Sequence, residues 1–364
     1  MSQWLICSLA LASLALAALW RWARPVAIPI QPQTTPCPTA PLAQPQPLLR
    51  PSTAVRTDLV WRTTDQLDED RRTRLLAGIR NIPRPPHALQ RLLEPEFMAR
   101  ASTAELRELV GGEPLVAARV LASINSPMYG LQSPVNDIGQ AVTYLGAASV
   151  RGLCLQHMLA ASFPSRLAGV RKTFHTLWNA SALASELAVR LDRMPGLPSA
   201  GPLNTPVVLG FVGSLATASL IPPTGLPAWL QREPEARARL EQDLLGLSAA
   251  EVGHLLMTHW GLPSALVDTV RDAGRLQVVP LPAGTAEPSP RLALAALCAR
   301  LGERLALGQL ASLDGYLVAE DESPDMQPLR MALAHPALAG LDIALQAPEL
   351  RRSVRQLLAP RTPA

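Results

Sequence analysis

From about residue 67 onward, apolar residues recur every three or four positions along the sequence. Ala117, Val120 and Ile124, for example, line one face of a predicted helix whose first residue is Pro114. No stretch shows the sustained two-residue alternation that is typical of half-buried strands. Because aromatic residues make up only 4% of the chain, the core must consist mainly of Leu, Ala and Val. The pattern therefore predicts an all-α fold of packed helices.

Two capping boxes predict where helices begin. Ser102 stands three residues before Glu105, and Ser248 stands three residues before Glu251. In such a box the serine hydroxyl accepts a hydrogen bond from the glutamate amide, while the carboxylate accepts one from the serine amide. We therefore expect a helix to start directly after each serine.

The N-terminus predicts a membrane anchor over residues 1–24. Trp4 to Trp20 is an uncharged apolar run, and a helix of this length spans roughly 25 Å at about 1.5 Å per residue. Arg21 and Arg24 follow the run and no basic residue precedes it, which places the remainder of the chain in the cytoplasm. A cleaved secretory signal and a buried core helix are the alternatives, but the former requires a basic start that is missing here. The expected location is the inner (cytoplasmic) membrane, with a single pass.

The sequence after the anchor divides into three further parts. Residues 25–66 are rich in Pro, Gln, Thr and Ala, a composition that predicts an extended, disordered tether. Residues 67–310 form the predicted helical domain. Short amphipathic pieces within residues 311–364 predict a C-terminal helical tail that packs on the body or on a partner.

The charge pattern disfavours nucleic acid as a partner. The formal net charge is +4, the arginines are scattered among acids, and Lys172 is the only lysine. A nucleic-acid surface usually shows a denser basic stripe. The four cysteines have neither metal-ligand spacing nor a disulfide pattern, which agrees with a reducing compartment.

Several short motifs occur in a characteristic order along the helical part. They are Ile82–Pro86, Glu113–Leu115, Asn125–Gly130, Ile138–Gly146, Leu177–Asn179 and Glu251–Pro263. Together they resemble the HDOD family, the bacterial output domains related to HD-type metal-dependent hydrolases, over roughly residues 82–274. The resemblance implies a multi-helix HDOD-like bundle that works as a signalling output or interaction module.

The departures from the hydrolase pattern concern its metal ligands. An HD hydrolase binds metal through a histidine, an adjacent His-Asp pair and a later aspartate. By resemblance, the first histidine is replaced by Ala180, and the His-Asp pair by Gly213 and Ser214. A His-His pair often seen near the end of the resemblance is replaced by Ala273 and Gly274. Alanine, glycine and serine cannot assemble that site, so we expect no metal, no other cofactor and no catalytic residues.

Other candidate residues carry weaker signals. Glu251 and His254 have a spacing found in di-iron bundles, but no second copy of the pair follows. His157 lies on an apolar helix face and is expected to be a core histidine with a hydrogen-bond partner. Gly210 and Gly213 are expected to permit close helix packing.

The sequence predicts a membrane-anchored, non-catalytic signalling or scaffold domain that binds other signalling proteins. Asn125, Ser126 and Tyr129, from the family motif, are the candidate interaction residues. One alternative is a phosphodiesterase or phosphohydrolase whose metal ligands lie elsewhere. Another is a nucleotide- or nucleic-acid-binding regulator.

Overall fold

The computed structural model describes residues 59–126, 129–131, 133–165, 167–198, 200–279 and 288–359. All of them belong to one compact unit, and every regular element in these ranges is helical, which confirms the all-α prediction. The predicted anchor over residues 1–24, and the tether up to residue 58, lie outside the described residues. In the part that the structure describes, no helix combines the length and the apolarity needed to cross a membrane.

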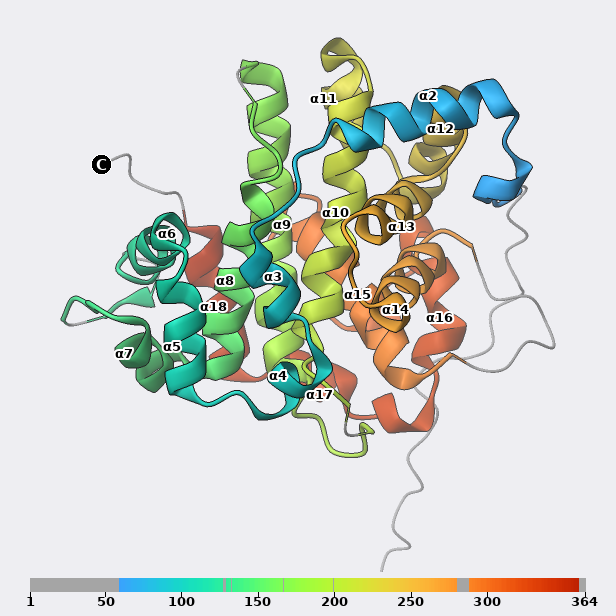
Figure 1. Ribbon diagram of the computed structural model, residues 1–364. Coiled ribbons are helices and arrows are strands. Elements are labelled where there is room, and N and C mark those ends of the chain that lie inside the picture. Colours follow the sequence, from blue (N-terminus) through green and yellow to red (C-terminus); the bar gives the residue numbers. More distant parts are fainter. Residues whose placement is uncertain are drawn as a thin grey trace, which may run out of the picture. The chain divides into compact units, whose positions relative to one another are not determined.

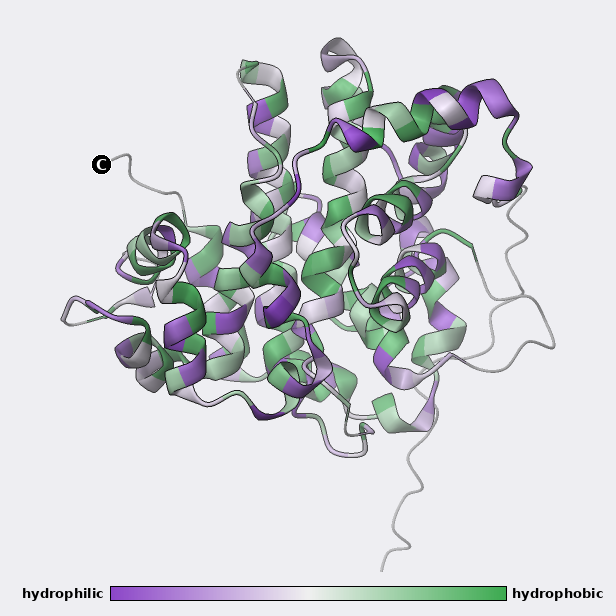
Figure 2. Ribbon diagram, viewed as in Figure 1, coloured by the Kyte–Doolittle hydropathy of each residue, from purple (hydrophilic) through white to green (hydrophobic). Residues whose placement is uncertain are grey.

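A central group of long helices organises the fold (Figure 1). Its members are α9 (Ala168–Leu191), α10 (Asn204–Leu220) and α15 (Pro290–Ala306). α9 packs against both of the others, and α10 is apolar around most of its circumference, as is typical of a helix enclosed by neighbours. Figure 2 shows the corresponding contrast with the hydrophilic first turns of α2 (Glu69–Arg80), where Arg71, Arg72 and Arg74 are exposed.

Two groups of shorter helices flank this centre. The first group consists of α3 (His87–Leu92), α4 (Pro95–Arg100), α5 (Thr103–Gly111), α6 (Pro114–Ile124), α7 (Ile138–Leu145) and α8 (Ala147–Ala160). The second consists of α11 (Leu226–Leu230), α12 (Pro234–Leu245), α13 (Ala249–His259) and α14 (Ser264–Leu276). α8 joins the first group to α9 and α10, whereas α13 and α14 pack on α10.

The C-terminal tail packs into the same core. Its elements are α16 (Gln327–Leu333), α17 (Leu341–Leu345) and α18 (Pro348–Leu358), with short 3-10 turns between them. Leu329, Leu341 and Leu350 are buried within the main hydrophobic cluster. On α9, Arg190 bonds to Glu349 at 3.3 Å, which ties α18 to the centre of the fold. Of the two expectations for the tail, packing on the body is the one observed.

One of the two predicted capping boxes forms and the other does not. The Ser102 amide donates to Glu105 Oε2 at 2.7 Å, and the Glu105 amide donates to Ser102 Oγ at 3.2 Å. Ser248 does precede α13, but its side chain makes no capping hydrogen bond. Glu251 instead accepts from the Trp61 indole at 2.8 Å, so the second box was wrongly predicted because a distant residue takes its carboxylate.

Residues 59–66, expected to end the disordered tether, are ordered against the body. The Arg62 amide donates to Gln242 Oε1 at 2.7 Å, and Leu59 is buried. Thr64–Gln66 forms a 3-10 turn (η1) ahead of α2. The composition argument failed here because side chains of α12 and α13 supply hydrogen bonds that the segment cannot make within itself.

Candidate functional site

The positions predicted to have lost metal ligands lie at close contacts between helices. A Cβ added at Gly213 of α10 would stand 2.1 Å from the carbonyl oxygen of Ala249 in α13. On the opposite side, a Cβ at Gly253 of α13 would stand 2.8 Å from the Gly213 Cα. The helices therefore approach each other so closely that backbone fills the space a side chain would need. Gly213 serves close packing as predicted, whereas Gly210 faces open space, and the prediction for it was wrong.

The same tight packing recurs at two of the other predicted positions. A Cβ at Gly274 of α14 would approach the Ala250 side chain to 2.8 Å. Ala180 of α9 faces α15, where a Cβ at Gly302 would come within 2.5 Å of the Ala180 carbonyl oxygen. Ala273 is buried on α14.

The residues present do not fit an HD-type metal centre. The contacts at Gly213 and Gly274 leave no room for histidine or aspartate without moving α13. Within the described ranges, no three His, Cys, Asp or Glu side chains lie close enough together to hold a metal ion.

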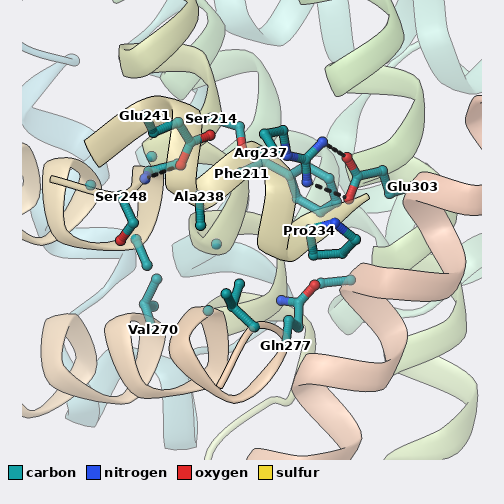
Figure 3. A pocket seen from close by; sticks show the side chains of 18 of the residues that line it. Phe211, Ser214, Pro234, Arg237, Ala238, Glu241, Ser248, Val270, Gln277 and Glu303 are labelled. Atoms are coloured by element: carbon teal, nitrogen blue, oxygen red, sulfur yellow. Dashed lines mark hydrogen bonds and ion pairs between the residues drawn. The ribbon is translucent and has the colours of Figure 1, made fainter. Parts of the chain in front are cut away.

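A small cavity with both apolar and charged side chains in its lining adjoins these contacts. It has a volume of about 80 Å³, and Gly213, Ser214 and Gly274 are part of its lining, whereas Ala180 is not. Figure 3 shows Arg237 and Glu303 facing each other on one side, with Ser248 across the cavity. The structure thus brings three of the five predicted positions to one cavity, next to charged residues that the sequence reading had not singled out.

The central pair of this cavity is Arg237 on α12 and Glu303 on α15. Arg237 Nη2 donates to Glu303 Oε2 at 3.0 Å, and Nη1 donates to Oε1, in a bidentate arrangement. Arg300 adds a further contact to Glu303 at 3.3 Å. Burial by itself would raise the pKa of Glu303, but Arg237 and Arg300 lower that pKa to about 2. Glu303 is therefore ionised throughout the physiological range.

Glu241 forms a second buried carboxylate site beside this pair. Its two oxygens accept from Trp229 Nε1 at 2.9 Å and from the Ala249 amide at 2.6 Å. Burial raises the pKa of Glu241, although Arg237 and both donors act in the opposite direction. The Arg237 guanidinium also lies 5.5 Å from the Trp229 ring centroid, within the range of a cation–π contact.

The ion-pair network continues from the cavity into the C-terminal tail. Arg300 and Arg304 lie 4.0 Å and 3.6 Å from Asp325, and Arg304 also bonds to Asp321. Asp321 further accepts from the Tyr316 hydroxyl at 2.8 Å. Burial raises the pKa of Asp321, but hydrogen bonds from neighbours that include Arg304 and Tyr316 lower it to about 2. The network joins α15 to the tail, so its first role is structural.

The buried polar groups without a hydrogen-bond partner in the cavity lining are a guanidinium N–H and a hydroxyl, not carboxylates. Both oxygens of Glu303 and both oxygens of Glu241 are engaged. Arg300 Nε and Ser248 Oγ are buried without a hydrogen-bond partner, and both residues line the cavity. The site therefore has no carboxylate to spare for a cation or for general base chemistry.

The predicted interaction motif lies elsewhere, at the end of α6. Asn125 Nδ2 donates to the Val135 carbonyl oxygen and Asn125 Oδ1 accepts from the Val135 amide, both at 2.7 Å. Ser126 Oγ donates to the Ser123 carbonyl oxygen at 2.6 Å, and Tyr129 is half-buried. Asn125 therefore holds the α6–α7 connection in place, as expected for a short side chain at a helix end.

Two of the histidines considered in the sequence have structural partners. His157 Nε2 lies 2.9 Å from Ser123 Oγ, which is the expected hydrogen-bond partner, but His157 is half-buried and not part of the core. His254 bonds to Asp268 at 3.1 Å, while Glu251 bonds to Trp61, so the i, i+3 pair is directed at two different partners.

Sequence reasoning missed the buried charges and Trp61. Arg237 and Glu241 belong to a stretch of alternating charges that resembles a solvated helix surface. Trp61 lies in a segment that composition assigned to the tether. No local pattern marks either feature, because their partners are distant in the sequence.

The all-helical architecture, with the sequence motifs in their order along it, defines a multi-helix bundle of the HDOD type. The HDOD domain family matches residues 82–275, more than half of the chain, and the chain belongs to this family. This confirms the resemblance drawn from the motifs.

Solved structures agree with this fold. An HDOD domain protein with unknown function from Geobacter sulfurreducens is 21% identical, with a TM-score of 0.52; the match covers 80% of this chain and 99% of that one. A candidate phosphohydrolase from Shewanella amazonensis SB2B is 22% identical (TM-score 0.47), with 78% and 97% covered. A candidate signal transduction protein from Marinobacter aquaeolei VT8 is 20% identical (TM-score 0.46), with 81% and 67% covered. No curated protein matches the chain.

Proposed function

We propose that the chain is a non-catalytic HDOD signalling module that acts by binding another protein. The observation that carries this proposal is the contact between Gly213 and Gly253, where helix backbone fills the space that metal ligands would need. The carboxylates of Glu241 and Glu303, which are buried nearby, already accept hydrogen bonds from Trp229, Ala249 and Arg237 within the protein. What remains for function is the surface of the domain.

The proposal includes the location of the module. The apolar run from Trp4 to Trp20, followed by Arg21 and Arg24, supports a single-pass anchor in the inner membrane with the helical domain in the cytoplasm. The Pro-rich segment would let the domain search a volume near the membrane and raise its effective concentration for membrane-bound partners. Reporters fused after residue 58 test this orientation: activity of an exported reporter there contradicts it.

The catalytic alternative is tested on the full-length chain, purified in mild detergent with divalent metals supplied. We expect substoichiometric metal by elemental analysis, and no hydrolysis of cyclic dinucleotides or generic phosphodiesters. Ser214→Ala is the matched control, since Ser214 stands where a ligand would be. Stoichiometric metal with turnover in both proteins places a hydrolase centre at other positions and overturns the proposal.

A further inference from the structure

Residues 59–62 are seated on the body by side chains from three helices. Gln242 of α12 clamps the backbone of the segment: its Oε1 accepts from the Arg62 amide at 2.7 Å, and its Nε2 donates to the Val60 carbonyl oxygen at 3.2 Å. Glu251 of α13 accepts from the Trp61 indole at 2.8 Å. Arg275 of α14 lies 5.8 Å from the Trp61 ring centroid. These three side chains contact the backbone and the indole of the segment, and the surface that they form is called the groove below.

Trp61 is also part of the lining of the small cavity described above. It lines the cavity together with Ser248, Gly274 and Gln277. The neighbouring Val60 side chain is 73% exposed, and Leu59–Thr63 has no regular secondary structure of its own. The segment is therefore held by a small number of contacts, which is typical of parts of a protein that open before the core.

Ser248 is a second potential partner for Glu251, and the two side chains form no hydrogen bond while Trp61 is bonded to Glu251. Ser248 precedes α13 with φ −72° and ψ 162°, and Ser102 precedes α5 with φ −71° and ψ 162°. Ser102 completes a capping box with Glu105, whereas Ser248 Oγ is buried without a partner. The backbone before α13 thus has the conformation that a capping box requires, while Glu251 Oε1 accepts from Trp61.

We propose that residues 59–62 are a releasable latch in a peptide-binding groove, and that Glu251 switches between Trp61 in the docked state and Ser248 in the released state. Release costs the indole bond, the two hydrogen bonds between Gln242 and the backbone, and the Arg275 contact. It frees Glu251 to complete the capping box, in which the buried Ser248 hydroxyl gains a partner. The latch lies within the predicted tether of residues 25–66, so a pull on the part of the tether before residue 59 acts on it first.

The chemistry of the groove also defines its external ligand. Glu251 requires an N–H donor, Arg275 an aromatic face, and Gln242 a backbone N–H and C=O in register. The partner is therefore a protein segment that presents Trp followed by Arg, as this chain does, and it binds when the latch is released. This part rests on the proposed function, in which the domain binds proteins.

Hydrogen exchange of the full-length chain tests the latch. We expect amides of residues 59–67 to exchange at least 10-fold faster than those in the middle of α10, because release does not need global unfolding. Trp61→Phe, which removes the indole donor, should accelerate that exchange by about 10-fold or more. Ser248→Ala should slow it by roughly 2- to 10-fold, because the released state loses its capping box.

Ser102→Ala is the matched control, since its box is already formed and lies away from the latch; it should leave the exchange of residues 59–67 unchanged. Two outcomes overturn the proposal. One is exchange of residues 59–67 only at the rate of the α10 core. The other is faster latch exchange in Ser248→Ala, which would show that the hydroxyl supports the docked state.

A labelled peptide of residues 59–64 tests the groove in trans. The full-length Trp61→Ala variant should bind it at least 10-fold tighter than the wild type, whose groove is occupied by its own segment. The same peptide with Ala in place of Trp should not bind. Equal binding by both proteins, or no binding by a folded variant, overturns the groove assignment. These results do not depend on metal content or turnover, which are the measurements that test the proposed function. Failure of the latch can therefore be distinguished from failure of the proposed function.

Discussion

At the contact between α10 and α13, helix propensity and packing have opposite effects on the free energy of unfolding when Gly213 is replaced by alanine. Gly213→Ala adds a methyl group whose carbon would stand 2.1 Å from the Ala249 carbonyl oxygen, where ordinary contact begins at 3.4 Å. The obstacle is helix backbone, so the two helices must separate by about 1 Å. Overpacking of a core costs typically about 1–3 kcal/mol, and a backbone obstacle places this site at the upper end of that range.

Helix propensity acts in the opposite direction, because alanine is better than glycine in a helix interior by about 1 kcal/mol. The net expectation is a loss of about 2 kcal/mol of unfolding free energy. Gly210→Ala is the matched control on the same helix, since a Cβ there meets nothing within 4 Å. It should be neutral or stabilise the protein by up to about 1 kcal/mol.

Urea denaturation of the full-length proteins, followed by far-ultraviolet circular dichroism, measures both effects. A Gly213→Ala protein as stable as the wild type would refute the reasoning. It would mean that α10 and α13 have room for a side chain at the former ligand position. The packing argument against a metal centre would then be lost as well.

Three further predictions concern an ion pair, two thiols and a helix-end side chain. Glu303→Gln should destabilise the domain by roughly 3–5 kcal/mol, since two buried arginines lose their charge partner. Because folding lowers the Glu303 pKa from 4.5 to about 2, its stabilisation is complete above about pH 4.5 and is lost as the pH falls toward 2; the variant should show a flatter acid limb in pH-dependent denaturation. Burial raises the pKa of Cys154 to about 12 and that of Cys298 still further, so neither should react with iodoacetamide at pH 8 until the protein is denatured, as peptide mapping would show. Asn125→Ala should lower stability by about 1–3 kcal/mol in thermal denaturation, and Ser126→Ala by less; unchanged stability in Asn125→Ala would argue against a structural role.

The starts of several helices could be predicted from the sequence because they depend on residues that are close together in the chain. The Ser102 box and the proline at the start of α6 act within one helical turn, and each appears where it was predicted. The identical pattern at Ser248 failed because Glu251 is bonded by Trp61, which lies far away in the sequence. A local motif states what a residue can do, and tertiary contacts decide among its possible partners.

By itself, the sequence determined the all-α class, the family and the absence of ligating residue types at Ala180, Gly213, Ser214, Ala273 and Gly274, since periodicity and residue identity are local properties. Only the tertiary structure showed that neighbouring helices fill that space, that Arg237 and Glu303 form a buried pair, and that Trp61 docks across α12, α13 and α14. These features depend on which helices pack against each other. The free energy of that packing comes from burial and charge pairing between residues that are distant in the sequence, so no short stretch of sequence reveals it.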